Sequence, residues 1–127
     1  MSLEDALRYR SMLVEHLELL SSAHAQREYQ RTVPIASVSA ELFCIWYDHV
    51  ADEAAIARFV PPAFSPDEQT AVRRMHAVLE GETSRGDQSL PCLEDFIDTP
   101  SWRRLHDEAV VALAVFQQRG AAPADLA

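Results

Sequence analysis

The sequence predicts an all-α fold, a single domain built as a bundle of four main helices with one or two short helical turns. Apolar residues recur at steps of three and four along most of the chain, which is the spacing of one helix face. Helix-capping residues stand in front of these runs, and no stretch of convincing length alternates as a strand would. The length of 127 residues suits one domain, so we expect a helical domain over residues 1–120 and a flexible tail over residues 121–127.

The first helix is expected from residue 3 to about residue 31. Ser2 stands at its N-cap with Asp5 three residues later, and Pro34 marks its end. A helix of this length would measure about 43 Å, so we expect a bend near Ser21. Its apolar stripe consists of Leu3, Leu7, Leu13, Val14, Leu17 and Leu20.

The second helix, from Ala40 to about Val50, is the most aromatic part of the chain. Cys44 lies between two large apolar residues there, so we expect it to be a small core residue. Residues 51–60 either extend this helix or form a short separate one, and Pro61 ends it either way. The predicted buried face consists of Leu42, Ile45, Trp46, His49 and Val50.

The third helix has the clearest start signal. Ser65 is a candidate N-cap, Pro66 suits the first helical position, and Glu68 completes a capping box. We expect this helix to run to Glu80, with Gly81 as its C-cap. The residues predicted to face inward are Val72, Met75 and Leu79.

A polar loop is expected over residues 81–91, followed by a short helical turn over residues 93–97. Thr99 and Pro100 open the last helix by the same capping logic, and Gly120 closes it. The residues predicted to face inward from it are Trp102, Leu105, Ala109, Leu113 and Phe116.

Composition limits the possible functions and location. The 20 acidic residues outnumber 11 basic ones, all of them arginines, so the net charge is −9. This charge argues against direct binding of nucleic acid or an anionic membrane, and it favours a basic partner. No apolar run is long enough to span a membrane, and the N-terminus shows no secretory signal. With two distant cysteines as well, the chain is expected to be cytoplasmic.

Several enzyme classes are excluded by missing residues. Without lysine there is neither Schiff-base chemistry nor a Walker A motif. The three glycines are too far apart for a dinucleotide-binding fingerprint or a nucleophile elbow. Cys44 and Cys92 cannot form a CxxC motif. We therefore expect no enzyme activity, no cofactor and no metal.

A metal-binding helical bundle is the alternative. His49 with Glu53, and His76 with Glu80, have the i,i+4 spacing that places two ligands on one helix face. Such pairs are also common by chance in an acidic chain, where a histidine at the edge of the core is the simpler interpretation.

Nearly all of the excess negative charge lies in the middle of the chain. Residues 38–72 have a net charge of −5 and residues 73–98 a net charge of −3, which together make −8 of the total of −9. The fields of clustered carboxylates add, and they can steer a cationic partner. This stretch is either a docking surface for a basic protein or a solvated face that aids solubility.

The stretch from about residue 30 to residue 118 resembles small helical immunity proteins of bacterial contact-dependent growth inhibition systems. The resemblance is carried by residues 41–48 (ELFCIWYD), 64–68 (FSPDE) and 90–95 (LPCLED), and by Trp102 with the alanine-rich helix behind it. It implies a protein that binds and neutralises a toxin domain, often a nuclease. An amphipathic four-helix chain can close alone or pair with a copy of itself, so both a monomer and a homodimer are expected possibilities. An acidic adaptor for some other partner is the third possibility.

Four residues of the resembling segments are more simply explained as core: Leu42, Trp46, Leu93 and Trp102. Acidic residues on the solvent side are better candidates for contact with the toxin. Their carboxylates would occupy the cationic groove that otherwise receives phosphates. The candidates are Asp48, Asp52, Glu53, Glu80, Glu82, Asp87, Glu94, Asp95 and Asp98.

Overall fold

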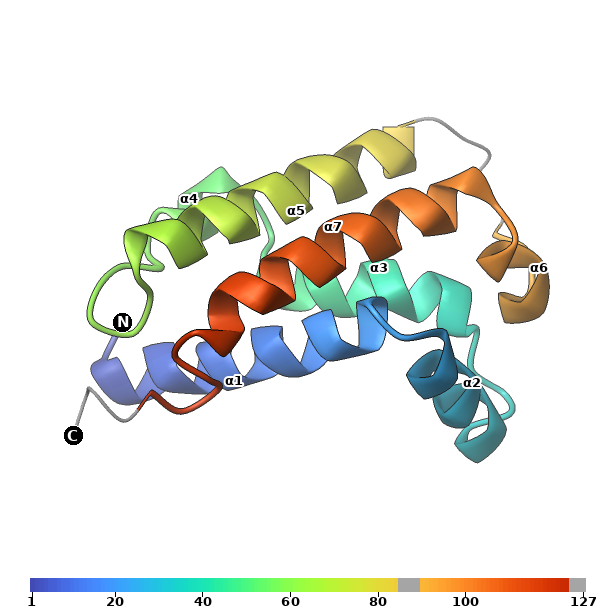
Figure 1. The fold of residues 1–127 in the computed structure, drawn as a ribbon, viewed down its shortest axis with the longest axis horizontal. Coiled ribbons are helices and arrows are strands. Elements are labelled where there is room, and N and C mark those ends of the chain that lie inside the picture. Colours follow the sequence, from blue (N-terminus) through green and yellow to red (C-terminus); the bar gives the residue numbers. More distant parts are fainter. Residues whose placement is uncertain (85–89, 124–127) are drawn as a thin grey trace.

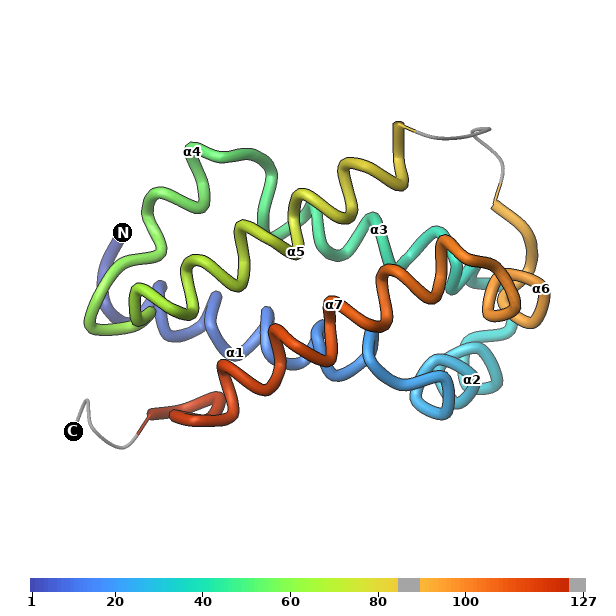
Figure 2. The backbone as a smooth tube through the Cα atoms, turned by 45° about the horizontal axis from the view of Figure 1, so that its top comes forward, coloured from blue at the N-terminus to red at the C-terminus, as the bar shows by residue number. Residues whose placement is uncertain are grey.

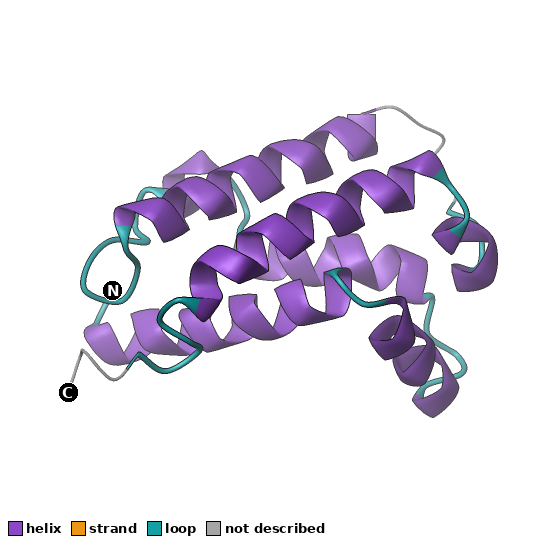
Figure 3. Cartoon of the chain, in the orientation of Figure 1, coloured by secondary structure: helices purple, strands orange, loops and turns teal. Residues whose placement is uncertain are grey.

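The computed structural model describes residues 1–84 and 90–123, and this part of the chain is helical without any strand (Figures 1 and 3). The prediction of an all-α fold is confirmed. No helix within the described ranges has both the length and the apolar character needed to cross a membrane. The helices are α1 (Leu3–Leu20), α2 (Ala23–Thr32), α3 (Val38–His49), α4 (Glu53–Ile56), α5 (Pro66–Ser84), α6 (Leu93–Ile97) and α7 (Pro100–Gln117).

The predicted first helix is in fact two helices. The prediction of one helix to residue 31 is wrong, since α1 ends at Leu20 and α2 turns away from it, although the break lies at the expected bend near Ser21 (Figure 1). The side chain of Ser22 accepts a hydrogen bond from the Ala25 amide and so caps α2. Gln26, fully buried, donates to the Leu19 carbonyl at 2.9 Å and accepts from the Trp102 indole at 2.8 Å. The first bond satisfies a carbonyl that a continuous helix would have bonded through its backbone, and the second anchors α2 to α7.

Helix α3 buries a narrower face than its sequence suggests. Leu42, Trp46 and Val50 are fully buried, whereas Ile45 and His49 are only half-buried. The prediction that Cys44 is a core residue is wrong, because it is exposed. The buried apolar residues of α3 are four positions apart. Cys44 lies two positions from Leu42 and two from Trp46, and it therefore points to the opposite side of the helix.

The chain after α3 forms a separate helix. Residues 53–56 make the four-residue α4, and the Asp52 side chain caps it by accepting from the Ala55 amide at 2.9 Å. Of the two expectations for residues 51–60, the short separate helix is therefore confirmed.

Helix α5 begins as predicted and ends later. Ser65 accepts from the Glu68 amide at 3.1 Å and Glu68 accepts from the Ser65 amide at 2.7 Å, which confirms the capping box. The prediction that Gly81 ends the helix is wrong, since α5 continues to Ser84. Arg104 of α7 binds Glu82 at 2.7 Å and so ties this last turn to the neighbouring helix, past a glycine that costs a helix about 1 kcal/mol.

The last two helices follow the prediction closely. Helix α6 covers the residues expected for the short turn. The Thr99 side chain caps α7, and Gly120 follows it with φ of 81°, a conformation that glycine adopts readily. Leu113 is half-buried and Ala112 takes the buried position.

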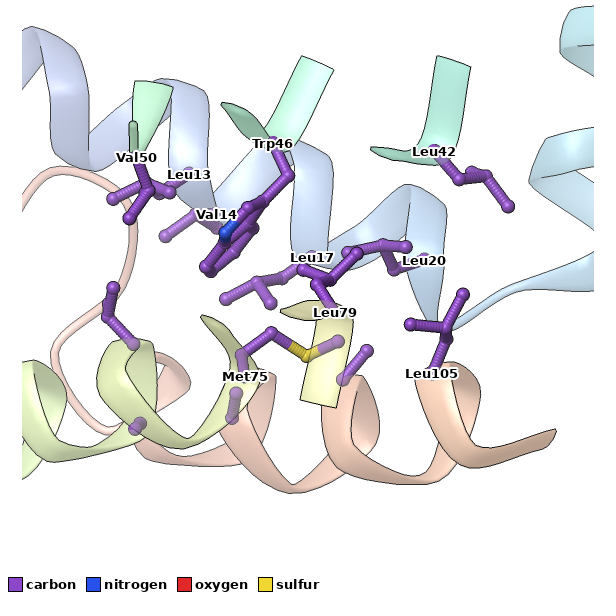
Figure 4. Packing of buried hydrophobic residues seen from close by; sticks show 14 of the residues in the cluster. Leu13, Val14, Leu17, Leu20, Leu42, Trp46, Val50, Met75, Leu79 and Leu105 are labelled. Atoms are coloured by element: carbon purple, nitrogen blue, oxygen red, sulfur yellow. The ribbon is translucent and has the colours of Figure 1, made fainter. Parts of the chain in front are cut away.

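The long helices α1, α3, α5 and α7 enclose the core, with α7 packed against α5 and α1, and α1 packed against α3 (Figure 2). Trp46 of α3 extends toward Val14 and Leu17 of α1, close to Met75 of α5 (Figure 4). The four residues predicted to be core, Leu42, Trp46, Leu93 and Trp102, are all buried.

Candidate protein-binding surfaces

One of the two candidate metal pairs, His76 and Glu80, does share a face of α5. His76 Nε2 lies 3.4 Å from the Glu80 carboxylate, and its Nδ1 accepts a hydrogen bond of 3.1 Å from the Trp46 indole. An indole N–H can only donate, so Nδ1 is the unprotonated nitrogen and is occupied by this bond. In the neutral ring Nε2, which faces Glu80, then carries the hydrogen and has no lone pair for an ion. The hydrogen bond from Trp46 to His76 links α3 to α5, so the role of this histidine is structural.

The second pair is separated by the fold. The expectation that His49 and Glu53 share a helix face is wrong, because α3 ends at His49 and Glu53 begins α4. Glu53 instead binds Arg73 of α5 at 3.1 Å. Over residues 1–84 and 90–123 no group of three or more histidine, cysteine or acidic side chains is arranged to hold a metal ion.

Three of the acidic candidates lie where α3 meets α4. Asp48 is exposed, and within the described chain its carboxylate forms no ion pair. The Asp52 carboxylate is also exposed and caps α4. Glu53 is exposed and paired with Arg73. This corner therefore offers Asp48 and Asp52 to a partner more freely than Glu53.

The other described candidates lie toward the end of the molecule that carries α6, opposite to α4 (Figures 1 and 2). The Glu82 side chain is 3% exposed and bound by Arg104, so it contributes to the fold rather than to the surface. Arg27 donates to Glu94 at 2.8 Å, and this bond lowers the pKa of Glu94. Asp95 and Asp98 are exposed beside them, as is Glu80 on α5. Asp87 lies outside the described residues.

Sequence reasoning missed a buried charged cluster made of Arg10, Glu68 and Arg119. The Arg10 guanidinium is fully buried and binds both Glu68 oxygens at 2.6 Å. It also donates to the carbonyls of Ala63 and Gly120, at 2.9 and 2.8 Å. Arg119 approaches the same carboxylate at 2.9 Å. The cluster joins α1, the start of α5 and the end of α7.

The cluster controls the ionisation of Glu68. Burial raises its pKa, but hydrogen bonds from Arg10 and the Ser65 amide, with the charges of both arginines, lower it by more, so the net effect is a pKa below the ordinary value of a glutamate. One signal in the sequence could have revealed the cluster. Arg10 lies on the apolar stripe of the first helix, three residues after Leu7 and four before Val14, where only a paired charge is tolerated.

Two surface grooves were also not predicted. One, of about 590 Å³, lies between α2, the segment that follows it and residues 90–94, and its wall includes the 97% exposed Ile35. Its arginines, Arg27 and Arg31, are paired with Glu94 and Glu28. The other, of about 440 Å³, lies between α1, α2 and α3. Both depend on the direction in which α2 departs from α1, which the local serine signals do not specify.

Comparison of the chain with protein-family models, with curated proteins and with solved structures finds no match.

Proposed function

We propose that this protein is an immunity protein, which binds a cognate bacterial toxin domain and neutralises it through an acidic surface. The toxin domain is a basic protein, in our proposal a nuclease. The immunity protein acts in the cytoplasm of the producing cell, as a monomer or homodimer, without enzymatic activity, metal or cofactor. Its binding domain covers residues 1–120 and is built on the bundle of four long helices.

The observation that carries this proposal is the distribution of partners among the charges. Most described arginines form ion pairs within the chain, whereas exposed carboxylates such as Asp48 form no ion pair in the part that the structure describes. The unneutralised charge is therefore displayed at the surface, where it complements a cationic groove that otherwise binds phosphates. The arginines in ion pairs are Arg8, Arg10, Arg27, Arg31, Arg73, Arg74, Arg104 and Arg119.

Within this surface we assign the corner of α3 and α4 to the toxin. Asp48 and Asp52 are both exposed there and neither is engaged by an arginine of the described chain. The resemblance to immunity proteins includes the segment that ends at Asp48. An arginine of the toxin can bind either carboxylate through two parallel hydrogen bonds, which supplies specificity as well as affinity.

Calorimetric titration with the toxin domain encoded immediately upstream of this gene tests the proposal, at low and at high salt. We expect nanomolar binding that weakens as salt rises, since exposed charges are screened. If the toxin domain binds at neither salt concentration, the immunity function is refuted for this gene pair and an acidic adaptor is favoured.

A matched pair of double variants locates the surface. Asp48→Asn with Asp52→Asn removes two charges at the α3–α4 corner and keeps an acceptor for the α4 cap. Asp95→Asn with Asp98→Asn removes two charges at the other end. We expect the first pair to weaken toxin binding by about tenfold and the second to weaken it by less than about threefold. Equal effects would show that only the net charge matters.

A further inference from the structure

The groove between α1, α2 and α3 has an apolar wall and lies on the same side as the end of α3. Leu19, Tyr29 and Ile45, from three different helices, are half-buried along it, and Met12 is 37% exposed at its edge. His49, the neighbour of Asp48, is also part of its lining. A volume of about 440 Å³ accommodates one long side chain of a partner.

One ring nitrogen in this groove has no hydrogen-bond partner among the described residues. The His16 side chain lines the groove, and the residue is only 3% exposed. Its Nε2 lies 2.9 Å from the Leu42 carbonyl, which can only accept, so Nε2 carries the hydrogen and Nδ1 is left as an acceptor. Within the described chain no group donates to Nδ1. Burial lowers the pKa of His16 to about 4, so the ring is neutral at pH 7 and does not repel a cation.

Two carboxylates line the same groove as this acceptor. Glu15 and Glu18 of α1 are exposed members of the lining, and neither forms an ion pair in the part of the chain that the structure describes. The lining contains no arginine among the described residues. The groove therefore combines an apolar wall, a neutral acceptor and two negative charges.

The complement of this groove is a cation with a long aliphatic stem and several donors. Arginine fits better than lysine, because its planar guanidinium presents five N–H donors, binds carboxylates through two parallel bonds and stacks on aromatic rings such as that of Tyr29. Its stem packs on the apolar wall while the head group binds the acceptors.

We propose that this groove receives an arginine side chain of the basic protein partner, with Glu15, Glu18 and His16 as the groups that bind the guanidinium. This inference rests on the proposed function for the identity of the partner. It extends the contact surface from the α3–α4 corner across α3 to α1, and it adds residues outside the acidic middle of the sequence.

The isolated head group is the first probe. NMR titration with ethylguanidinium, beside the neutral ethylurea of nearly the same shape, reports binding without any toxin. We expect saturable shifts at the groove residues, with the 15N signal of His16 Nδ1 moving as it accepts a hydrogen bond, and binding of ethylurea at least about tenfold weaker. Shifts that do not saturate, or that occur outside the groove, would overturn the inference.

Variants at exposed positions connect the probe to the groove. Glu15→Gln with Glu18→Gln is expected to weaken ethylguanidinium binding by about tenfold, because the shape is kept and both charges are lost. Asp95→Asn with Asp98→Asn removes the same amount of negative charge elsewhere and should leave this binding unchanged. Equal weakening by both pairs would contradict a localised site.

The same variants separate this inference from the proposed function. A toxin domain that binds the parent protein and the Glu15→Gln, Glu18→Gln variant equally well would refute the arginine site and leave immunity standing. A toxin domain that binds neither protein would refute immunity, and the ethylguanidinium titration would still decide whether the groove binds a guanidinium group.

Discussion

Helix α1 contributes to two charged regions of opposite design. At one, Arg10 is fully buried and its guanidinium is bound by Glu68 and by carbonyls of the chain itself. At the other, Glu15 and Glu18 line an open groove and form no ion pair among the described residues. The first region uses its charges to hold three segments together, and the second leaves its charges available.

The comparison teaches that a count of acidic residues does not map a binding surface. Glu68 and Glu82 count toward the net charge, yet both side chains are nearly inaccessible and are bound by arginines. The charge of a carboxylate that is paired inside the fold is largely neutralised by its arginine, so it attracts a binding partner only weakly. The surface relevant to binding is the set of carboxylates that the fold leaves unpaired.

The largest expected effect comes from disrupting the buried ion pair of Arg10 and Glu68. Glu68→Gln leaves the Arg10 guanidinium buried without its counter-charge, and we expect it to lower the free energy of unfolding by about 3–5 kcal/mol, measured by urea denaturation. The double variant Arg10→Met with Glu68→Leu, which removes both charges, should cost less than the single change. A loss below about 1 kcal/mol for Glu68→Gln would show that the ion pair is dispensable.

The next effect concerns pH and the His16 ring. Burial lowers its pKa from 6.5 to about 4, so the unfolded chain binds a proton more readily than the folded protein. The stability due to neutral His16 is complete above pH 6.5 and is lost as the pH falls from 6.5 to about 4, in total about 3 kcal/mol.

The variant His16→Gln keeps a donor for the Leu42 carbonyl and cannot titrate. We expect its free energy of unfolding to decline less steeply than that of the parent protein between pH 6.5 and 4.5, measured by urea denaturation at a series of pH values. Glu68, whose pKa is held below its ordinary value by Arg10 and Arg119, adds its own loss of stability as the pH falls from the ordinary carboxyl range toward its folded-state pKa, in both proteins alike. Parallel curves for the two proteins down to pH 4.5 would show that His16 is not buried as a neutral ring.

Local signals in the sequence predicted much of the fold. The capping residues of α1, α5 and α7 are recognisable because each cap bonds to a backbone amide only three residues away. The errors have tertiary causes. The α1–α2 break depends on Gln26 meeting Trp102, 76 positions later, and the extension of α5 past Gly81 depends on Arg104 of another helix.

The candidate surfaces were harder to predict than the fold. Sequence could identify acidic residues but not their partners, so Asp48 and Glu82 looked equivalent, although one is exposed and the other is bound by Arg104. The groove between α1, α2 and α3 could not be predicted from the sequence either. Three helices form it, and their relative placement follows from the α1–α2 break.

The smallest expected effect concerns an ion pair at the surface, in contrast to the buried pair of Arg10 and Glu68. Arg27 and Glu94 form an ion pair between α2 and α6 in which both side chains are more than half exposed. An exposed pair gains little, because water screens the charges and both side chains lose freedom. We expect Arg27→Gln to leave the Tm unchanged within error in thermal denaturation, although it frees Glu94 and makes the protein more negative by one charge. If the toxin surface lies on the α1–α3 side, this variant should also bind the toxin domain as the parent does. Tighter binding by Arg27→Gln would place the α6 end in contact with the toxin and reverse our assignment of the two ends.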